Sequence, residues 1–518
     1  MDERKIEIII YATDENFLAR LIQSLEAAVV PENFSAEIQP VTGEEKYFAY
    51  DEAMRASDAK YKIYLDERAV VTDENFLIEL LEIFQDKKIG AVGTSGTIEL
   101  STHGVSLTSD KRAPKNFCGR AEIVDGFFFA TQYDLPWRYD LFKDNFFGGQ
   151  AQCVEFKRAG YKIFIGGDWI SYSGENFKIN EAARNIFLDE YSKDLFPLVS
   201  VLIPTFNRPK YFKQALDSVL NQTYRNFEIV ISDDSTNDET EAVIQKYLDD
   251  PRIKYFRHKG FTAHDNWNFL RAYNNPAAEY VNWLMDDDFF HPTKLEKMIE
   301  VYRTNPDVSL VTSAKNFIDA DGKIIGDTKN LFGCDVKIPG DEAARLLFLW
   351  DNYIGEPTTV LIRKKFLRDG DLCLNADETG AFSLVDVSTW LQLLSKGNMF
   401  RFSECLSSFR LHAGHAGGST NVKVLLAVSY TKLLKDSMDK KIFKNENELH
   451  AAMFFILNYQ LQKLKEAFAK NYRGKSVETL EKYFAATAQA LSNGYKLELP
   501  PRGYSEEELE REQLKEGD

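Results

Sequence analysis

The stretch that most constrains this chain is an apolar run that leads directly into three adjacent carboxylates. Residues 280–285 have the character of a buried strand, and Asp286, Asp287 and Asp288 follow without a break. Pro292 comes shortly afterwards, and proline favours the first turn of a helix. Acids at a strand end lie where open α/β sheets bind their ligands. Because adjacent carboxylates repel one another, the pattern predicts either a divalent cation held by carboxylate oxygens or a solvated acidic turn in which Asp288 caps the helix.

Two strands upstream end in the same manner, in a polar loop that precedes a helix. The strands cover residues 199–203 and 227–232. Asn207 and Pro209 suit the N-cap and the first turn of the helix that follows the first of them. The polar residues after these strands are Pro204, Thr205, Asn207 and Arg208 in the first loop and Asp233 and Asp234 in the second.

Length and charge narrow the class of protein. The 518 residues are enough for two or three domains, and the 44% apolar content allows a large core. A formal net charge of −17 argues against a nucleic-acid partner, which basic patches would bind. The five cysteines have no metal-ligand or redox spacing, and no apolar run reaches the length of a transmembrane helix. We therefore expect a cytoplasmic protein with reduced thiols and no signal peptide.

The first 170 residues alternate strand and helix in the order that the later part repeats. Strands are expected at residues 6–11, 35–41 and 61–65, and the third ends in Asp66, Glu67 and Arg68. This triplet has the same position in the first copy that the acidic triplet has in the second. Arg68 replaces an acid there. Alternation of this kind predicts a mostly parallel sheet, and the repeated order predicts two related units. The missing acid favours a first copy that is no longer catalytic and now serves for binding or as a scaffold. The alternative is a second active unit with unusual ligands.

The three strand ends, in this order, resemble the family 2 glycosyltransferases, which have the GT-A fold. The resemblance runs from Leu198 to about Thr420. It implies an α/β chain of two tandem GT-A, Rossmann-like units with mostly parallel sheets. The expected parts are a degenerate GT-A-like domain (1–170), a connector (171–197), a catalytic domain (198–420), a helical C-terminal region (421–500) and a charged, disordered tail (501–518).

The resemblance also implies roles for the strand-end residues. Asp287, Asp288 and His412 become the ligands of Mn²⁺ or Mg²⁺, and Asp286 contacts the ribose. The family often has an aspartate where Met285 stands, which leaves the ligand register open by one position. The donor is bound by Pro204, Thr205, Asn207, Arg208, Asp233 and Asp234. A carboxylate can accept the N3–H of uracil, which favours a UDP-linked donor.

The family's catalytic base lies at an acidic helix start, and Asp386 matches that position. The family usually has two acids there, whereas Val385 precedes the single acid of this chain. Counting back equally from Gly397 and Gly160 pairs Asp386 with Gly149, so the first copy has no base. The alternative for Asp386 is a helix N-cap. Glu356 is a further candidate for the acceptor side.

The resemblance, with these residues in the family's positions, implies a metal-dependent, inverting glycosyltransferase. It would move a hexose or an N-acetylhexosamine from a UDP-sugar to a hydroxyl of a surface glycan or glycoprotein precursor. A bifunctional two-site glycan polymerase and a non-catalytic carbohydrate-binding scaffold are the alternatives. The helices after residue 421 predict a bundle packed on the second unit, with acids interspersed on their polar faces. They offer a surface for a homo-oligomer, and peripheral docking at the inner face of a membrane is the other interpretation.

Overall fold

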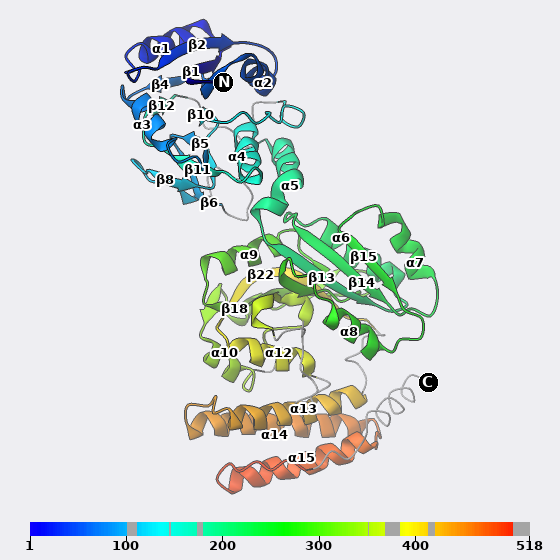
Figure 1. The fold of residues 1–518 in the computed structure, drawn as a ribbon. Helices are drawn as coiled ribbons and strands as arrows, with labels where there is room; N and C mark the ends of the chain where they lie inside the picture. Colours follow the sequence, from blue (N-terminus) through cyan, green and yellow to red (C-terminus); the bar gives the residue numbers. More distant parts are fainter. Residues whose placement is uncertain are drawn as a thin grey trace. The chain divides into compact units, whose positions relative to one another are not determined.

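The computed structural model describes residues 1–100, 111–143, 147–173, 180–350, 352–367, 384–412 and 420–500. The expected charged tail and Cys373 lie outside these ranges. The chain divides into two compact units, Met1–Phe196 and Pro197–Asp518 (Figure 1). Both combine helices with a sheet, so the predicted α/β class is confirmed.

The first unit is built on a sheet with the strand order β2-β1-β3-β10-β5-β11-β8. β1, β2 and β3 are parallel, whereas β10 runs antiparallel to both of its neighbours. The sheet is therefore mostly parallel, as predicted, and β10 and β8 are the antiparallel strands that make it mixed. The strands are β1 (Asp2–Tyr11), β2 (Ser35–Val41), β3 (Ala59–Asp66), β5 (Ile89–Gly93), β8 (Gly119–Ala121), β10 (Phe128–Thr131) and β11 (Lys162–Ile165).

Helices cover both faces of this sheet. Apolar side chains of α1 and α3 pack with alternate residues of β1 and β3 on one face. The other face carries an aromatic cluster in which Trp137 contacts Tyr50, Tyr64 and Phe129. Residues 180–196, expected in the connector, begin with an N-cap at Asn180 and form α5, which packs on α4. The helices are α1 (Glu15–Leu25), α2 (Lys46–Ala56), α3 (Phe76–Ile83), α4 (Gly148–Arg158) and α5 (Glu181–Leu195).

The second unit has a larger mixed sheet with the order β15-β14-β13-β16-β21-β18-β22-β17. β19 and β20 pair at its side, with β18 and β22 respectively. The strands are β13 (Leu198–Thr205), β14 (Phe227–Asp233), β15 (Ile253–Arg257), β16 (Ala278–Trp283), β17 (Phe289–Phe290), β18 (Val308–Ile318), β19 (Ile324–Asp327), β20 (Val336–Ile338), β21 (Leu361–Arg363) and β22 (Asn398–Arg410).

The helices of this unit separate its strands along the chain. The prediction that Pro292 opens a helix is wrong by one short turn, because α9 begins at Lys294 with Thr293 as its N-cap. Asp288 therefore does not cap it. The helices beside the sheet are α6 (Pro209–Leu220), α7 (Glu239–Ile244), α8 (Ala263–Ala272), α9 (Lys294–Thr304), α10 (Gly340–Leu346) and α12 (Val385–Leu394), with a 3-10 turn η3 (Pro357–Thr359).

Three long helices complete the second unit, as the sequence predicted for its C-terminal region. They are α13 (Thr420–Asp439), α14 (Glu446–Ala469) and α15 (Lys475–Ser492). Buried residues of these helices, such as Leu434 and Ile456, share one apolar cluster with Phe348 and Trp390 of the α/β part. The helices therefore pack on the domain through a continuous core, and burial of such side chains is the main stabilising contribution.

The two units repeat the same strand order and directions. β2-β1-β3-β10-β5-β11 of the first unit corresponds to β14-β13-β16-β21-β18-β22 of the second. In both, three parallel strands are followed by an antiparallel strand and then by a parallel pair. The internal repeat read from the sequence is thus a repeat of topology. β15 extends the second sheet beyond β14, and the described residues of the first unit hold no counterpart of it.

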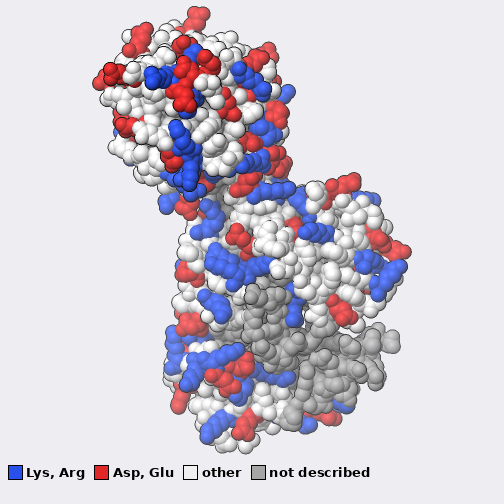
Figure 2. Space-filling model, in the orientation of Figure 1, with Lys and Arg blue, Asp and Glu red and all other residues white. Residues whose placement is uncertain are grey.

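Acidic and basic side chains are interspersed on the face of the molecule seen in Figure 2. The net charge of −17 is therefore not gathered in one block on this face. No helix in the described part of the chain combines the length and the apolarity that a membrane crossing needs.

Candidate active site

The carboxyl ends of β13, β14 and β16 meet at one edge of the second sheet. β13 pairs with β14 so that Thr205 faces Asp233, and with β16 so that Leu202 faces Trp283. The backbone N–H of Asp234 donates to the carbonyl of Thr205 at 3.3 Å. The three polar segments predicted from the sequence are therefore neighbours in space, at the edge where such sheets bind ligands.

The first loop follows Pro204 and Thr205 and is tied to the second loop through Asn207. The side-chain Nδ2 of Asn207 donates to the hydroxyl of Thr236 at 2.9 Å. The backbone N–H of Thr236 donates to the side-chain Oδ1 of Asn207 at 2.9 Å. Asn207 has a φ of 50°, in the left-handed region that asparagine tolerates. The prediction that it caps α6 is wrong, because Arg208 is the N-cap and Asn207 instead joins two loops.

Asp286 and Asp287 are buried acids that share one guanidinium. The Arg208 Nη1 lies 3.1 Å from an oxygen of Asp286 and 3.0 Å from an oxygen of Asp287. The N–H of Phe206 donates to the other oxygen of Asp286 at 3.2 Å. The two aspartates are only 5% and 7% exposed. Burial, and secondarily the Asp287 charge, raises the pKa of Asp286 to about 6 despite Arg208. The pair therefore forms a site that needs positive charge.

His412 reaches the same carboxylate from a distant part of the chain. Its Nε2 lies 3.0 Å from the Asp287 oxygen that also contacts Arg208, and its ring lies 5.2 Å from that of Tyr211. A carboxylate oxygen and an imidazole nitrogen this close match the ligand types of Mn²⁺, and Mg²⁺ is commonly held by one or two carboxylates plus substrate phosphates. The described residues contain no ready group of three such ligands. They fit a cation that completes its shell with the donor.

Asp288, predicted as a third ligand, is engaged by the protein on both oxygens. One accepts the N–H of Arg410 at 3.0 Å, and the other accepts the hydroxyl of Thr358 at 2.7 Å. Burial raises the pKa of Asp288 well above its usual range, and the Asp287 charge adds to this. In this geometry Asp288 joins β22 and η3 to the end of β16, and its role as a metal ligand stays a prediction.

Arg410 organises the site, and sequence reasoning did not single it out. Its side chain is fully buried. Its Nε donates to the carbonyl of Asp287 at 2.7 Å, and its Nη2 donates to Gln214 at 2.5 Å. Its guanidinium also lies 4.5 Å from the centre of the Tyr211 ring. Arg410 therefore holds the backbone of the acidic triplet in place. The sequence feature that could have identified it is its position at the end of the strand before His412.

Asp233 is held by the protein on both oxygens. The hydroxyl of Tyr255 donates to one at 2.7 Å, and the N–H of Ser235 donates to the other at 2.8 Å. Arg257 lies 3.0 Å from that second oxygen. With no exposed surface, Asp233 is placed to shape the second loop, and its predicted contact with the donor stays untested.

Asp234 lies beside two buried polar atoms that have no hydrogen-bond partner in the described residues. The Asn266 side chain donates to Asp234 at 2.6 Å, while its own oxygen and the hydroxyl of Thr205 are left unpaired. Unpaired buried polar atoms cost free energy and point to a missing partner. Burial raises the pKa of Asp234 to about 6, with smaller contributions from the charges of Asp233 and Asp286. This group can receive the polar edge of a base.

Asp386 is the second residue of α12, and the N-cap of that helix is Leu384. The alternative in which Asp386 caps the helix is therefore wrong. The Asn352 amide nitrogen donates to one oxygen of Asp386 at 2.7 Å, and the N–H of Val387 donates to the other at 2.8 Å. Asp386 is half-buried, so it is oriented by the protein and still accessible.

One short segment, residues 352–359, links Asp386 to the acidic triplet. Asn352 at its start contacts Asp386, and Thr358 near its end contacts Asp288. The indole N–H of Trp390 on α12 donates to the carbonyl of Gly355 at 3.0 Å, which pins its middle. The Glu356 side chain, a candidate for the acceptor side, pairs with Lys315. This segment therefore connects the candidate base, Asp386, to the acidic triplet.

Two family models match this chain. The family model described as Glycosyl transferase family 2 matches residues 200–370, which include the strand-end acids. Residues 200–370 belong to glycosyl transferase family 2. A second model, described as Glycosyltransferase like family, matches residues 7–191 in the first unit. The predicted resemblance is therefore confirmed for both units.

Relatives match this chain over short segments. A GalNAc(5)-diNAcBac-PP-undecaprenol beta-1,3-glucosyltransferase of Campylobacter jejuni is 39% identical over 93 residues, covering 18% of this chain and 30% of that protein. Protein CgeD of Bacillus subtilis is 34% identical over 128 residues, covering 23% and 30%. The chain spans less than a third of the length of these relatives. The S. aureus TarS 1-349 structure in complex with UDP-GlcNAc is 15% identical, with a TM-score of 0.35, covering 59% of this chain and 93% of that chain.

The same edge of the first unit differs from the family 2 domain in its charges. Asp66, at the end of β3, pairs with the ammonium of Lys46 at 2.9 Å, and Lys46 is only 4% exposed. Glu67 accepts hydrogen bonds from the N–H groups of Thr13 and Asp14. A buried lysine therefore balances the strand-end acid here, where the second unit presents Asp287 beside His412.

The position of the base in the first unit is a glycine whose close neighbours leave no room for a side chain. Gly149 is the second residue of α4, as Asp386 is the second residue of α12. A Cβ on Gly148 would lie 2.2 Å from the Tyr47 ring, and a Cβ on Gly149 would lie 2.8 Å from the backbone of Gly126. A carboxylate side chain does not fit at either glycine without a shift of these neighbours.

Proposed function

We propose that the family 2 domain is a metal-dependent, inverting glycosyltransferase. It transfers a hexose or an N-acetylhexosamine from a UDP-sugar to a hydroxyl of a surface glycan or glycoprotein precursor. The observation that carries the proposal is the meeting of Asp287 and His412, 3.0 Å apart, at the carboxyl end of β16 in a domain of this family. The Campylobacter relative is named a glucosyltransferase, which agrees with a hexose donor.

The donor's diphosphate would lie against Asp287 and His412, which hold the cation, with Arg208 beside it. When bound, the cation supplies Lewis-acid stabilisation of the leaving diphosphate. The Arg208 guanidinium, now shared between Asp286 and Asp287, would turn towards a phosphate once the cation balances these acids. Asp286 is then left to accept a hydrogen bond from the ribose. In this way the acids at the sheet edge bind an anionic donor in an acidic protein.

The uracil would bind at Asp234, Asn266 and Thr205, and their unpaired atoms support this placement. Asp234 accepts the N3–H of the base, and the Thr205 hydroxyl can donate to one of its carbonyl oxygens. Asp233 supports the loop through Tyr255 and Ser235 rather than touching the base.

Asp386 would remove the proton from the acceptor hydroxyl. The acceptor oxygen then bonds to the anomeric carbon from the face opposite the UDP, and the bond from that carbon to the diphosphate oxygen breaks. The proton ends on Asp386, and UDP leaves with the bonding electrons. Asn352 holds the carboxylate in place for this step. A single displacement of this kind inverts the anomeric configuration.

The first unit, by the same reasoning, does not transfer sugar. Lys46 pairs with Asp66, and the backbone of Gly126 blocks a side chain at Gly149, where a base would have to project from α4. A buried ammonium next to the strand-end acid removes both the negative charge and the space that a divalent cation needs. This unit then serves as a scaffold or a binding domain for the active one.

The experiment that tests the proposal measures UDP release from a panel of donors. With Mn²⁺ or Mg²⁺ present, we expect release from one of UDP-Glc, UDP-Gal, UDP-GlcNAc and UDP-GalNAc, and none from GDP-mannose. Excess EDTA should lower that rate about 100-fold or more, because the cation contributes several kcal/mol to leaving-group stabilisation. Restoring Mn²⁺ should restore the rate. A rate that EDTA leaves unchanged, or no release from any UDP-sugar, contradicts the proposal.

The affinity for UDP should depend on pH through Asp234. Its pKa of about 6 means that the carboxylate is mostly ionised at pH 7.5 and mostly protonated at pH 5. Because only the ionised form gives a charge-assisted bond to the N3–H of uracil, UDP binding should weaken about tenfold over this range. Asp234→Asn should bind more weakly at pH 7.5 and show a shallower profile. The ionisation of UDP itself affects wild type and Asp234→Asn equally. Profiles of the same steepness for the two proteins would therefore contradict the assignment.

A further inference from the structure

Trp350 is the exposed tryptophan of this chain, and it lies just before the segment that holds the candidate base. All six tryptophans fall within the described residues. Four of them are at most 3% exposed and Trp267 is partly buried, whereas Trp350 is 48% exposed. Tryptophan is highly buried on average, and exposed apolar surface next to polar groups marks ligand sites. Trp350 is therefore a candidate contact for a ligand of this side of the domain.

The path of the chain brings Trp350 to the candidate base. α10 begins beside the end of α12, where a Cβ on Gly340 would lie 2.2 Å from the carbonyl oxygen of Leu394, and the two helices lie side by side (Figure 1). The chain then runs back to the first turn of α12, where the Asn352 side chain donates to Asp386 at 2.7 Å. Trp350 is two residues before Asn352, so their Cα atoms are at most about 7 Å apart. Trp350 therefore lies at the same end of α12 as the candidate base.

Neighbouring residues hold Trp350 in place. Its backbone N–H donates to the carbonyl of Leu346 at 2.9 Å, and Phe348, two positions earlier, is buried in the core. The Phe332 ring lies 5.6 Å from the indole, and the Tyr353 ring packs edge-to-face with it at 6.2 Å. Aromatic pairs at these separations attract one another beyond their area burial. The exposed indole is thus part of a packed cluster, and little of its freedom remains to be lost when a ligand binds.

The surface around the indole is apolar on one side and polar on the other. Leu349 and Leu331 are exposed beside Trp350 and Phe332 along the chain. Asn352 and the rest of the segment that holds Asp386 supply the polar side. A pyranose ring matches such a surface, because its C–H bonds give it an apolar face and its hydroxyl groups lie around the rim. An acyclic polyol or a serine side chain has no face of this kind.

We propose that Trp350 is the stacking platform for the acceptor, and that the acceptor hydroxyl therefore belongs to a pyranose ring of a saccharide. This inference rests on the proposed function, in which Asp386 takes the proton of that hydroxyl. A ring that is seated on the indole presents its rim to the first turn of α12. Holding the acceptor in this way supplies the orientation that the displacement needs. Trp350 acts by binding and positioning, and the proton transfer stays with Asp386.

The test measures binding of methyl glycosides by saturation-transfer NMR, with UDP and Mn²⁺ present. The probes are the methyl pyranosides of glucose, galactose, N-acetylglucosamine and N-acetylgalactosamine, and sorbitol and N-acetylserine amide serve as comparisons. We expect the ring protons of at least one glycoside to receive saturation from wild type, and the two comparison compounds to receive several-fold less. Trp350→Ala should bind that glycoside at least about tenfold more weakly, because a truncated aromatic contact at the centre of a site costs this much or more.

Two further variants separate ring stacking from general apolar contact. Trp350→Phe keeps an aromatic face and should stay within about threefold of wild type. Trp350→Leu keeps apolar area without a ring and should bind as weakly as Trp350→Ala. In transfer to the same glycoside, Trp350→Ala should raise the acceptor KM about tenfold with kcat within about threefold, the pattern of lost uniform binding. The Tm of each variant reports whether the fold is kept.

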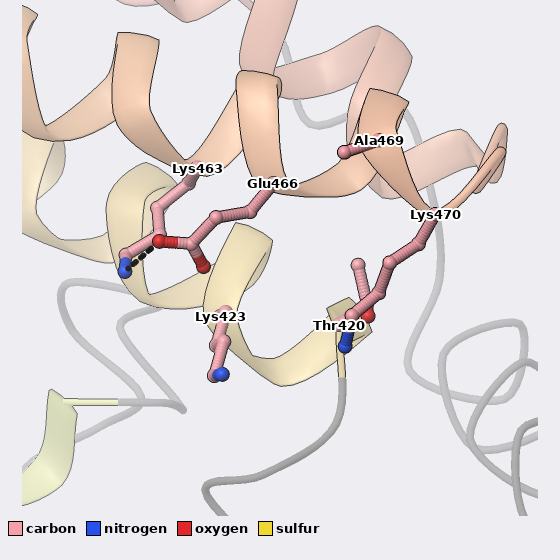
Figure 3. Close-up of a pocket in the computed structure, with 6 residues that line it drawn as sticks. All are labelled: Thr420, Lys423, Lys463, Glu466, Ala469 and Lys470. Carbon is pink, nitrogen blue, oxygen red and sulfur yellow. Dashed lines mark hydrogen bonds and ion pairs between the residues drawn. The ribbon is translucent and has the colours of Figure 1, made fainter.

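Two controls address other surfaces of the same unit. Phe454→Ala removes an exposed aromatic ring from α14 and should bind the glycoside as wild type does. The competing place for a saccharide is a cavity of about 310 Å³ between α13 and α14, whose lining side chains Figure 3 shows. Lys423→Gln/Lys470→Gln changes that lining and should also bind as wild type does. Loss of glycoside binding in this variant but not in Trp350→Ala would place the saccharide there and overturn the proposal.

The remaining outcomes separate this inference from the proposed function. Wild type that binds no methyl glycoside, or Trp350→Leu that binds as tightly as Trp350→Phe, overturns the stacking role. Phospholipid vesicle binding that Trp350→Ala loses, with its glycoside affinity unchanged, assigns the surface to a membrane and also overturns it. UDP release from a donor with an unchanged acceptor KM in Trp350→Ala contradicts this inference alone. Absence of UDP release from every donor contradicts the proposed function itself.

Discussion

Replacing Asp287 by asparagine is expected to lower kcat/KM for sugar transfer about 10³-fold or more. The side chain keeps its shape, and an amide oxygen still accepts from Arg208 and His412, which now lie 3.0 Å from the carboxylate. What is lost is the charge that holds the cation. Leaving-group stabilisation by a metal is worth several kcal/mol, and each 1.36 kcal/mol is tenfold in rate.

The measurement combines UDP release with a Mn²⁺ titration of the rate. The Asp287→Asn variant should need far more Mn²⁺ for half-maximal activity, whereas its Tm should stay close to that of wild type. His412→Gln should show the same shift in smaller degree, because one neutral ligand is lost instead of a charge. If Asp287→Asn keeps more than about a tenth of the wild-type rate at the original Mn²⁺ concentration, the metal is not held here.

The matched control uses the internal repeat. Glu67 follows Asp66 in the first unit, as Asp287 follows Asp286 in the second, and it accepts hydrogen bonds from Thr13 and Asp14. Glu67→Gln should leave transfer unchanged if only the second unit is active. Loss of one of two sugar products on this change would instead support a bifunctional polymerase.

The sequence predicted the strand ends closely because the patterns there are local. The strand expected at residues 35–41 is β2, and the strand expected at 227–232 is β14 with one more residue. Both sheets are mostly parallel as predicted, but the sequence did not reveal the antiparallel strands β10 and β21, since the direction of a short strand depends on which end of the sheet the chain enters. Nothing in an apolar run of three or four residues records that direction.

The candidate site was predictable where residue type and strand position coincide, as at Asp287 and Asp234. It was not predictable where distant segments meet. Arg410 donates to Asp288 across 122 positions of the chain, and the pairing of Asn352 with Asp386 spans 34. Such contacts depend on the packing of β22 and α12 against the sheet, and single-sequence periodicity does not contain this packing. For the same reason, the contacts of Asp288 with Arg410 and Thr358 could not be predicted from the sequence.

Replacing Asp386 by asparagine is expected to lower kcat for transfer about 10²–10⁴-fold, with little change in UDP affinity. A general base typically contributes a factor of this size, and the amide cannot take the proton of the acceptor hydroxyl. Asp386 lies at the start of α12, and the segment of residues 352–359 lies between it and the acids that we propose hold the donor. The two functions should therefore separate in the kinetics.

Three measurements distinguish this role from a structural one. The pH profile of kcat should lose its acidic limb in Asp386→Asn, because that limb reports ionisation of the base. UDP binding and Tm should remain near wild type. Asn352→Ala, which removes the hydrogen bond at 2.7 Å that orients Asp386, should cost about tenfold in kcat and keep the acidic limb. An Asp386→Asn enzyme with the wild-type rate and an unchanged pH profile would remove Asp386 from the reaction and leave the acceptor side without a base.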